Sequence, residues 1–513
     1  MGLAHVRTVA LLGMSGQLVD VEVDIGRGLP AVIITGLPDT ALTEARDRVR
    51  AAVVNSRHEW PARRITINLG PGDVPKHGTG YDLAIAAGVL VATRQAPARR
   101  LRDAVLIGEL SLDGRLRAVR GVLPAALAAV EQGVTTVVVP ADCAAEAALV
   151  PGATVVALGG VADLVAWLCG ADMPLPPPGP SRSPEGSGSG PDLADVVGQP
   201  FGRAALEVAA AGGHHLLLSG PPGVGKTMLA ERLPGLLPPL SPRAALEATA
   251  VHSLAGRLLT GGALLTRPPY EAPHHSASRT ALIGGGSARL SPGVVSLAHH
   301  GVLFLDEAPE FATDVLQALR QPLESGVVVL RRTGRAAVFP ARFQLVLAAN
   351  PCPCGFAGTP GDRCRCTPAA RRRYASRLGG PLADRIDVQV DLPPVRAADL
   401  AADRGHTDTT ATVAARVRAA RERAAARMRR TGLGDAWQCN GQVPGAVVRR
   451  HWSLSAVAAE PAHQLLSRGL VSARGVDRIL RVAWTLADLA GRDQPGRADV
   501  LEAAGYRGVG VAA

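Results

Sequence analysis

A phosphate-binding loop is the feature that most limits how this chain can fold. Residues 220–227 read GPPGVGKT, which matches G-x-x-x-x-G-K-[ST] between an apolar run at 215–219 and a helical run at 228–233. Its glycines let backbone N–H groups approach phosphate oxygens, and the start of the helix adds positive potential. Lys226 is expected to reach the β- and γ-phosphates of a nucleotide, and Thr227 to hold Mg²⁺. The predicted cradle consists of Gly220, Pro221, Pro222, Gly223, Val224, Gly225, Lys226 and Thr227.

Lysine is rare enough in this chain to draw attention to Lys226. Among 55 lysines and arginines, only Lys76 and Lys226 are lysines. A compact ammonium fits inside a phosphate loop, whereas a broad guanidinium does not. The formal net charge is +11, which favours an anionic partner without identifying it.

Two carboxylates follow an apolar run further along the chain. Residues 301–305 read GVLFL, which predicts a buried strand, and Asp306 and Glu307 come directly after it. Asp306 is expected to bind Mg²⁺, and Glu307 to orient or deprotonate the attacking water. Such a strand is common by itself, but after a phosphate-binding loop it indicates nucleotide hydrolysis.

Composition indicates a globular protein. The chain has 513 residues, of which 47% are hydrophobic and 19% charged, and this length suffices for roughly two to four domains. No run of about 18 uncharged apolar residues predicts a membrane span. Residues 1–23 carry charges unlike those of a signal peptide, and seven cysteines do not make a secreted disulfide framework. We therefore expect a soluble cytoplasmic protein.

A Pro/Gly/Ser-rich stretch divides the chain. Residues 174–191 read PLPPPGPSRSPEGSGSGP, a composition that predicts a linker because it neither packs nor pairs strands. Before it, residues 1–173 alternate β-rich and alanine-rich helical runs, as an α/β domain does. After it, residues 192–392 hold the nucleotide motifs and begin with a predicted helix at 192–210. Residues 393–513 turn helical, most clearly at 410–430.

Four segments together resemble one family. They are APHHSAS at 272–278, GVLFLDE at 301–307, NPCPCG at 350–355 and GPLADRID at 380–387. In this combination the chain resembles the YifB/ComM family of magnesium-chelatase-like AAA+ ATPases. The resemblance implies an N-terminal α+β domain of the ribosomal S5/Lon-protease type, a P-loop α/β core and a C-terminal helical lid. It also implies ATP, Mg²⁺ and a hexameric ring. ComM members are described as DNA helicases that drive branch migration during natural transformation.

The resemblance also suggests roles for residues outside the two motifs. Asn350, after a predicted strand at 343–349, takes the position of the polar group between nucleotide and water in AAA+ ATPases. Arg385 would be an arginine finger that reaches the γ-phosphate of a neighbouring subunit. The alternative for Arg385 is an intradomain salt bridge with Asp384 or Asp387.

A second candidate arginine lies in the helical C-terminal region. Arg474 begins a predicted helix, from which it could contact phosphate as part of a lid. Arg478 and Arg481 follow at helical spacing and compete for the same role.

The N-terminal domain resembles Lon without the residues of the Lon Ser–Lys dyad. Gly80 stands about where the Lon serine would fall, and residues 120–123 contain no lysine where the Lon lysine is expected. Lys76 is the only lysine of this domain and lies in a different place. The domain is therefore expected to lack peptidase activity, and it could instead recruit a protein partner.

Four cysteines crowd one Gly/Pro-rich loop. Cys352, Cys354, Cys364 and Cys366 form two C-x-C pairs. Four thiolates can close a tetrahedral Zn²⁺ site and fix a loop that has little core of its own. The alternatives are reduced free cysteines or a redox pair.

Arginine-rich elements are candidates for contact with DNA. Residues 325–338 predict a β-hairpin with Arg331, Arg332 and Arg335 at its tip, which in related helicases enters the pore. The alternative is a solvated basic turn. Glycine-rich residues 282–287 could form a second pore loop. The seven arginines of 416–430 form either a DNA-facing stripe or a solvated helix face.

Three histidine pairs also attract attention: His214–His215, His274–His275 and His299–His300. Adjacent histidines point apart on strands and helices, so structural roles are expected for them. By family position, residues 274–276 should lie near the nucleotide or the pore.

The leading hypothesis is a cytoplasmic AAA+ ATPase that forms hexameric rings and moves on DNA. The rivals are a magnesium-chelatase-type motor and a Lon-like ATPase, each remodelling a protein partner, and a scaffold that binds nucleotide without turnover. Intact Asp306 and Glu307 argue against the scaffold.

Overall fold

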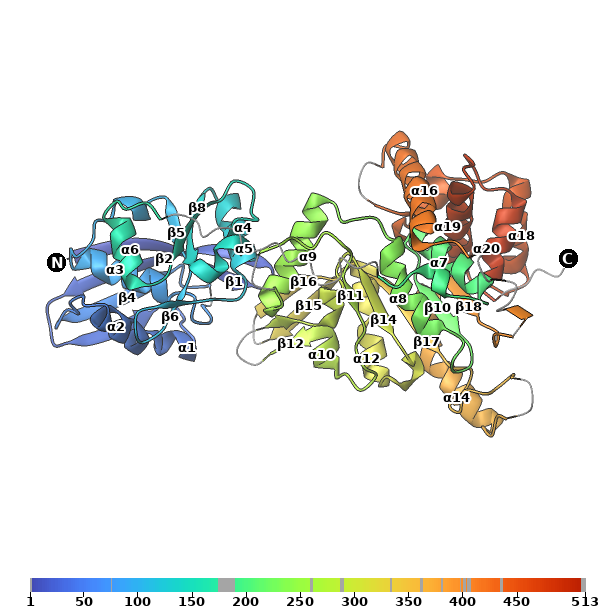
Figure 1. The fold of residues 1–513 in the computed structure, drawn as a ribbon, viewed down its shortest axis with the longest axis horizontal. Helices are drawn as coiled ribbons and strands as arrows, with labels where there is room; N and C mark the ends of the chain where they lie inside the picture. The colour runs from blue at the N-terminus through green and yellow to red at the C-terminus, as the bar shows by residue number, and fades with distance from the viewer. Residues whose placement is uncertain are drawn as a thin grey trace.

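The computed structural model describes most of the chain in three successive regions (Figure 1). The described residues are 2–74, 76–173, 190–258, 262–286, 290–332, 335–359, 363–379, 382–396, 398–399, 403, 407–433 and 437–508. The side chains of residues 40, 41, 332 and 335 lie outside this description, as does most of the predicted linker.

The N-terminal region is built on a seven-stranded mixed sheet with the order β3-β4-β2-β1-β5-β8-β9. Strand β2 shows why the sheet forms: Val19, Val21, Val23 and Ile25 are buried, and the residues between them face outward. The elements are β1 (Gly2–Leu12), β2 (Ser15–Gly26), β3 (Ala31–Thr35), α1 (Thr40–Thr43), α2 (Ala45–Asn55), β4 (Arg64–Gly70), α3 (Asp82–Ala92), η1 (Arg99–Leu101), β5 (Ala104–Leu106), β6 (Glu109–Leu110), β7 (Leu116–Arg117), α4 (Val122–Glu131), β8 (Thr136–Pro140), η2 (Ala141–Cys143), α5 (Ala144–Ala147), β9 (Thr154–Leu158) and α6 (Val161–Leu168).

The central region contains a five-stranded parallel sheet with the order β11-β14-β17-β10-β18. Strands β14 and β17 are buried at every position, which matches their apolar sequences; Gln344, the one polar residue, donates its amide hydrogens to the carbonyls of Ala209 and His214. The elements are η3 (Leu193–Asp195), α7 (Pro200–Gly212), β10 (Leu216–Ser219), α8 (Lys226–Leu236), α9 (Pro242–Ala255), β11 (Tyr270–Glu271), α10 (Arg279–Ile283), β12 (Gly284–Gly285), β13 (Ser291–Pro292), α11 (Val294–Leu297), β14 (Val302–Leu305), η4 (Ala308–Glu310), α12 (Thr313–Ala318), α13 (Arg320–Ser325), β15 (Val327–Arg332), β16 (Arg335–Pro340), β17 (Gln344–Ala349), α14 (Pro368–Leu378), η5 (Ala383–Arg385) and β18 (Val388–Asp391).

The C-terminal region is helical among the residues described there. Val417, Ala420 and Ala424 of α16 belong to the same hydrophobic core as α7 and α8, so this region packs firmly on the central one. The elements are α16 (Thr410–Arg430), η6 (Asn440–Gln442), α17 (Gly445–His451), α18 (Ala456–Ser467), α19 (Ala473–Leu489) and α20 (Arg497–Gly505). The predicted multidomain α/β class with a helical C-terminal region is confirmed.

One helix boundary differs from the sequence prediction. The helix expected over residues 192–210 is a single 3-10 turn, η3, followed by α7 from Pro200 onward. A proline fits the first turn of a helix, where its missing N–H costs nothing, so α7 begins there.

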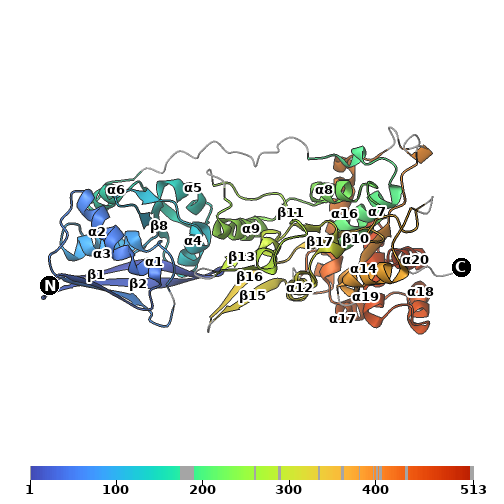
Figure 2. The same cartoon turned by 90° about the horizontal axis from the view of Figure 1, so that it is seen from below.

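The N-terminal region contacts the central one at two places (Figure 2). Helix α4 lies against α9, where Ser253 donates a short hydrogen bond to Glu146. The turn between β1 and β2 reaches β16, and the backbone N–H of Met14 donates to the carbonyl of Val338 at 3.4 Å. Both contacts join the N-terminal sheet to elements that flank the five-stranded sheet.

Candidate active site

The phosphate-binding loop closes over the carboxyl end of β10. Gly220 is the first residue after the strand, and its N–H donates to the carbonyl of Ala349 at 3.1 Å. Gly223 and Gly225 have φ values of +79° and +93°, which residues with a side chain rarely adopt. These glycines turn the chain directly into α8, whose first residue is Lys226.

Lys226 is buried inside this loop. Its Nζ donates to the carbonyls of Gly220 at 2.7 Å and Pro221 at 2.9 Å, and to Oδ1 of Asn350 at 3.0 Å. An ammonium has three donors, and two of them are directed at the loop while the third reaches the residue that follows β17. Burial lowers the pKa of Lys226, while the charges of Asp306 and Glu307 act in the opposite direction.

The acidic pair lies at the same edge of the sheet. Leu305 pairs with Leu347 of β17, and Ser219 of β10 pairs with Ala349, so the three strands end together. Oγ1 of Thr227 donates to Oδ2 of Asp306 at 2.9 Å. A hydroxyl and a carboxylate oxygen side by side are ligands that Mg²⁺ accepts.

Glu307 is held in a left-handed backbone conformation. Its φ is +49° and ψ is +42°, and its N–H donates to Oδ1 of Asp306 at 2.8 Å. A non-glycine residue in this region costs on the order of 1 kcal/mol or more, and such strain occurs often at functional sites. This turn therefore separates the carboxylate of Glu307 from that of Asp306.

His275 contacts Glu307, and this contact could not be predicted from the sequence. Its Nδ1 lies 3.3 Å from Oε2 of Glu307. His275 follows β11, and β11 pairs with β14 in parallel, so the residues after these two strands meet. From the sequence, residues 274–276 were expected near the nucleotide or the pore, but no contact partner could be named for them.

The two candidate arginines lie together. Arg385 forms an ion pair with Glu324 of α13 rather than with Asp384 or Asp387, the partners considered in the sequence. Burial, and then the charges of Arg320 and Arg474, lower the pKa of Arg385.

Arg474 is exposed at the start of α19 and has no hydrogen-bond or ion-pair partner in the described part of the chain. Its two competitors are turned inward: Arg478 lies 3.3 Å and Arg481 3.6 Å from Oδ1 of buried Asp387. Of the three, only Arg474 therefore presents its guanidinium to the surface, close to Arg385.

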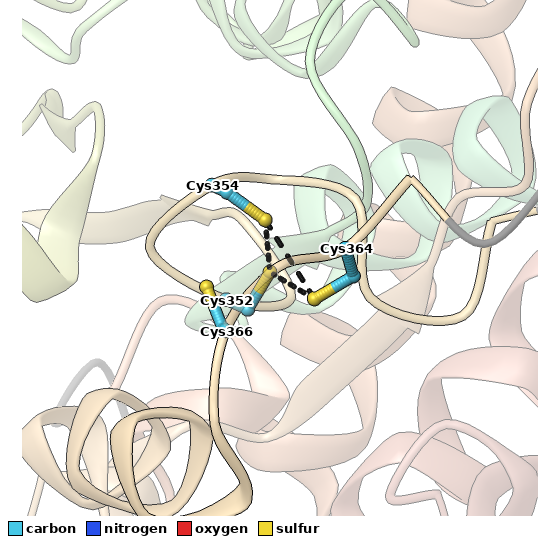
Figure 3. A group of neighbouring side chains, drawn as sticks. All are labelled: Cys352, Cys354, Cys364 and Cys366. Atoms are coloured by element: carbon cyan, nitrogen blue, oxygen red, sulfur yellow. Dashed lines mark hydrogen bonds between the residues drawn. The ribbon is translucent and has the colours of Figure 1, made fainter.

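The four cysteines converge as the spacing predicted (Figure 3). The Sγ atoms of Cys352, Cys354 and Cys364 lie 3.4–3.6 Å apart, and Cys366 completes the group. A tetrahedral zinc with Zn–S bonds of about 2.3 Å needs Sγ atoms about 3.8 Å apart, so the donor set fits this ion. The backbone N–H of Phe356 lowers the pKa of Cys354 to about 6, whereas the neighbouring thiols raise the pKa of Cys366 to about 11, so the cluster readily supplies one thiolate without a metal.

Zinc content tests this centre. Protein purified without chelator is expected to hold about one zinc per chain, because four thiolates form a closed structural site. The double variant Cys352→Ser/Cys364→Ser should hold almost none by inductively coupled plasma mass spectrometry. Cys169→Ser, which changes an exposed cysteine outside the cluster, should keep the wild-type content. Wild-type protein without zinc would contradict the assignment.

A second group of potential ligands has a structural role. Nε2 atoms of His299 and His300 lie 3.4 and 2.9 Å from Oε2 of Glu247. The N–H of Arg342 donates to Nδ1 of His299 at 3.0 Å, so the ring proton of neutral His299 resides on Nε2. Burial lowers the pKa of His299 to about 4. A protonated Nε2 cannot bind a metal, and it donates to Glu247 instead.

The predicted basic hairpin is present as β15 and β16. Arg331 pairs with Ala336 and Arg332 with Arg335 across the two strands. The side chain of Arg331 is exposed. The two residues of the turn, and the side chains of Arg332 and Arg335, lie outside the described part. In the glycine-rich candidate loop, Gly284–Gly285 pairs with Ser291–Pro292, and Ser287 is outside the description.

The arginines of α16 do not form a free DNA-facing stripe. Arg416 pairs with Glu207, Arg423 donates to the carbonyl of Asp488, and Arg427 is buried against the Asp488 carboxylate. Only Arg427 is buried, whereas Arg416 and Arg423 stay exposed but are engaged by partners distant in sequence. Arg430, at the end of the same helix, is exposed.

Lys76 has a structural contact inside the N-terminal region. Lys76 is fully buried, and its Nζ donates to the carbonyl of Pro71. The segment at 120–123 lies at the contact with α9, where the N–H of Leu123 donates to Glu146 at 2.8 Å. Lys76 and the segment where the Lon lysine was expected therefore both have structural contacts.

Three family models match successive parts of the chain. The model described as magnesium chelatase, subunit ChlI, matches residues 192–400. The model for subunit ChlI of Mg-chelatase matches residues 21–143, and the one for its C-terminal part matches residues 407–507.

Several curated proteins are similar along their whole length. Rv2897c of Mycobacterium tuberculosis (strain H37Rv) is 52% identical over 512 residues, with all of both chains covered. YifB of Escherichia coli K12 is 42% identical over 512 residues, and competence protein ComM of Haemophilus influenzae is 41% identical over 513 residues. Each of these two alignments covers 99% of this chain and 98% of the relative.

The matches and the parallel sheet with its phosphate-binding loop define a magnesium-chelatase-like AAA+ ATPase. Within that class, the chain belongs to the YifB/ComM family. Membership implies ATP and Mg²⁺ as cofactors. The N-terminal region is also similar to part of the Lon protease of Clostridioides difficile, at 29% identity over 153 residues. None of the helices in the described ranges is long and apolar enough to cross a membrane.

Proposed function

We propose that this protein hydrolyses ATP between the subunits of a hexameric ring and uses the energy to move on DNA, as a helicase or branch-migration factor. The observation that carries the ATPase part is the contact of Lys226 with Asn350 and of Thr227 with Asp306 at one edge of the sheet. Lys226 would bind the β- and γ-phosphates, and Thr227 and Asp306 would hold Mg²⁺.

Glu307 and Asn350 would act on the attacking water. The left-handed turn at Glu307 separates its carboxylate from the metal-binding Asp306, which leaves it available as the base. Asn350 would lie between the γ-phosphate and the water, because its amide oxygen already meets the ammonium of Lys226.

Arg385 and Arg474 would complete the site of a neighbouring subunit. Their charges lie close enough to influence each other, and Arg320 joins them. Three neighbouring guanidinium groups suit a phosphate group, and one Glu324 carboxylate partly neutralises them in the single chain. ATP bound by the neighbour would replace Glu324 as the partner of Arg385.

The hairpin β15–β16 supports the DNA part of the proposal. Its tip carries three arginines and no acidic residue, and Arg331 is exposed. Arg331, Arg332 and Arg335 would contact the DNA backbone inside the ring. The turn between β1 and β2 touches β16, so the N-terminal region supports this hairpin from outside. This region would act without peptidase activity.

The ATPase rate with and without DNA tests this proposal. Single-stranded or branched DNA should raise the rate several-fold at low salt, and the stimulation should decline steeply with salt, since phosphate contacts release counterions. Stimulation by a protein or tetrapyrrole partner alone would favour the remodelling ATPases instead. Casein cleavage that is lost on substitution of one serine would show that the N-terminal region is a protease.

His275→Ala is expected to raise the ATPase rate in the absence of DNA. An exposed pair such as His275 with Glu307 contributes up to about 1 kcal/mol, so releasing the carboxylate should raise the rate roughly two- to fivefold. DNA should then stimulate less. His274→Ala, which removes a ring bonded to Ser276 instead, is the matched control. A lower basal rate in His275→Ala would mean that the histidine supports the base rather than restrains it.

A further inference from the structure

Positive charge is concentrated on the four-cysteine loop and α14. The DNA contacts proposed for the hairpin do not involve this charge. Residues 363–377 contain six arginines and no acidic residue. In α16, by comparison, Arg416 and Arg427 are neutralised by carboxylates of the same chain, while Arg418, Arg429 and Arg430 stay exposed. In residues 352–359 and 363–378, which we call the cysteine module, most of this charge is left open to solvent.

Three arginines of the cysteine module are unpaired. Arg365, Arg372 and Arg373 are exposed, and their guanidinium groups form no hydrogen bond or ion pair with other residues in the described ranges. Of the remaining three, Arg371 donates to the carbonyl of Cys366, and Arg363 lies over the ring of Phe356. Arg377 donates to the carbonyl of Pro309 and has the one acidic partner among the six, Glu310 at 3.8 Å, in the described ranges.

The cysteine module projects from the body of the protein. Figure 1 shows α14 at the margin of the central region, away from the five-stranded sheet. Of its eleven residues only Tyr374 and Leu378 are buried, so most of its circumference faces outward. Arg365 lies between Cys364 and Cys366, and ligation of both cysteines would fix its backbone.

The cysteine module is joined to the candidate active site at two points. A Cβ atom placed on Gly355 would lie 2.6 Å from Cγ of Pro222, so the loop packs directly on the phosphate-binding loop. Arg377 bonds to Pro309, which lies two residues after Glu307. A ligand bound on this rigid, basic projection would therefore be connected to the nucleotide site through these two contacts.

We propose that the cysteine module is a second DNA-binding surface, on which Arg365, Arg372 and Arg373 pair with backbone phosphates outside the ring pore. The inference rests on the proposed action on DNA. Guanidinium groups recognise phosphate oxygens in pairs, and an uncompensated cluster of them favours a polyanion over a single small anion. Contacts of this kind carry no sequence preference.

Binding of a fluorescein-labelled single strand, followed by anisotropy over a range of salt, tests the inference. The triple variant Arg365→Gln/Arg372→Gln/Arg373→Gln should lower the slope of log K against log salt by about 2, since each single-strand phosphate contact contributes about 0.7. Affinity should fall roughly 100-fold at about 0.1 M salt. The matched control is Arg418→Gln/Arg429→Gln/Arg430→Gln, which removes three exposed and unpaired arginines of α16. It should keep the wild-type slope.

The outcomes separate this inference from the proposed function. Wild-type binding with an unchanged slope in the first variant, or equal losses in both variants, overturns the inference alone. A wild-type protein that neither binds DNA nor is stimulated by it overturns both. Zinc content and sedimentation of the variants verify folding. If the first variant dissociates where the wild type is assembled, the cysteine module is a contact between subunits and the inference is wrong.

Discussion

Glu307→Gln is expected to keep ATP binding and to lower turnover by about 10²- to 10⁴-fold, the usual contribution of a general base. The amide has nearly the shape of the carboxylate, so the turn that joins Asp306 and Glu307 should persist. A coupled ATPase assay gives the rate, and a fluorescent ATP analogue gives the affinity.

Glu310→Gln is the control for this variant. Glu310 is an exposed carboxylate three residues further along, 3.8 Å from Arg377, and the same substitution there should keep the rate. Normal hydrolysis in Glu307→Gln would mean that another group deprotonates the water.

Arg385→Ala is expected to lower ATPase activity by about 10³-fold or more, the contribution of an arginine finger to phosphoryl transfer. Its own chain should still bind ATP, because Lys226 and Thr227 are intact. Arg450→Ala, which removes an exposed arginine of α17, should leave the rate unchanged.

Mixed rings distinguish a finger from a residue that acts within its own subunit. Glu307→Gln subunits supply Arg385, and Arg385→Ala subunits supply Glu307, so some interfaces in a mixture contain both. Activity should therefore return on mixing two inactive proteins. A mixture that stays inactive, although it assembles, would place the action of Arg385 within its own chain or in folding.

Much of the fold and of the candidate site could be predicted from short sequence patterns. A motif of eight residues and an apolar strand ending in two carboxylates were enough to bring Lys226 and Asp306 to one edge, because parallel strands in register end together. The spacing of the cysteines likewise predicted their convergence. The alternation of apolar and polar residues in β2 is also a local pattern, and it predicts a strand.

Contacts between residues distant in sequence could not be predicted in this way. The ion pair of Arg385 with Glu324, the contact of His275 with Glu307 and the burial of Arg427 against Asp488 all depend on tertiary packing. The arginines of α16 show the consequence. Helical spacing groups them on one face, but only the partners on α7 and α19 decide whether that face is free.

The most direct test of the account is displacement of a labelled strand from a forked DNA duplex, measured with ATP for the wild-type protein and for Glu307→Gln. If hydrolysis at Glu307 drives movement on DNA, the wild-type protein should displace the strand, and the variant should bind the fork without displacing it. Wild-type protein that hydrolyses ATP but leaves the duplex intact, or a variant that displaces the strand as fast as the wild type, would contradict the account.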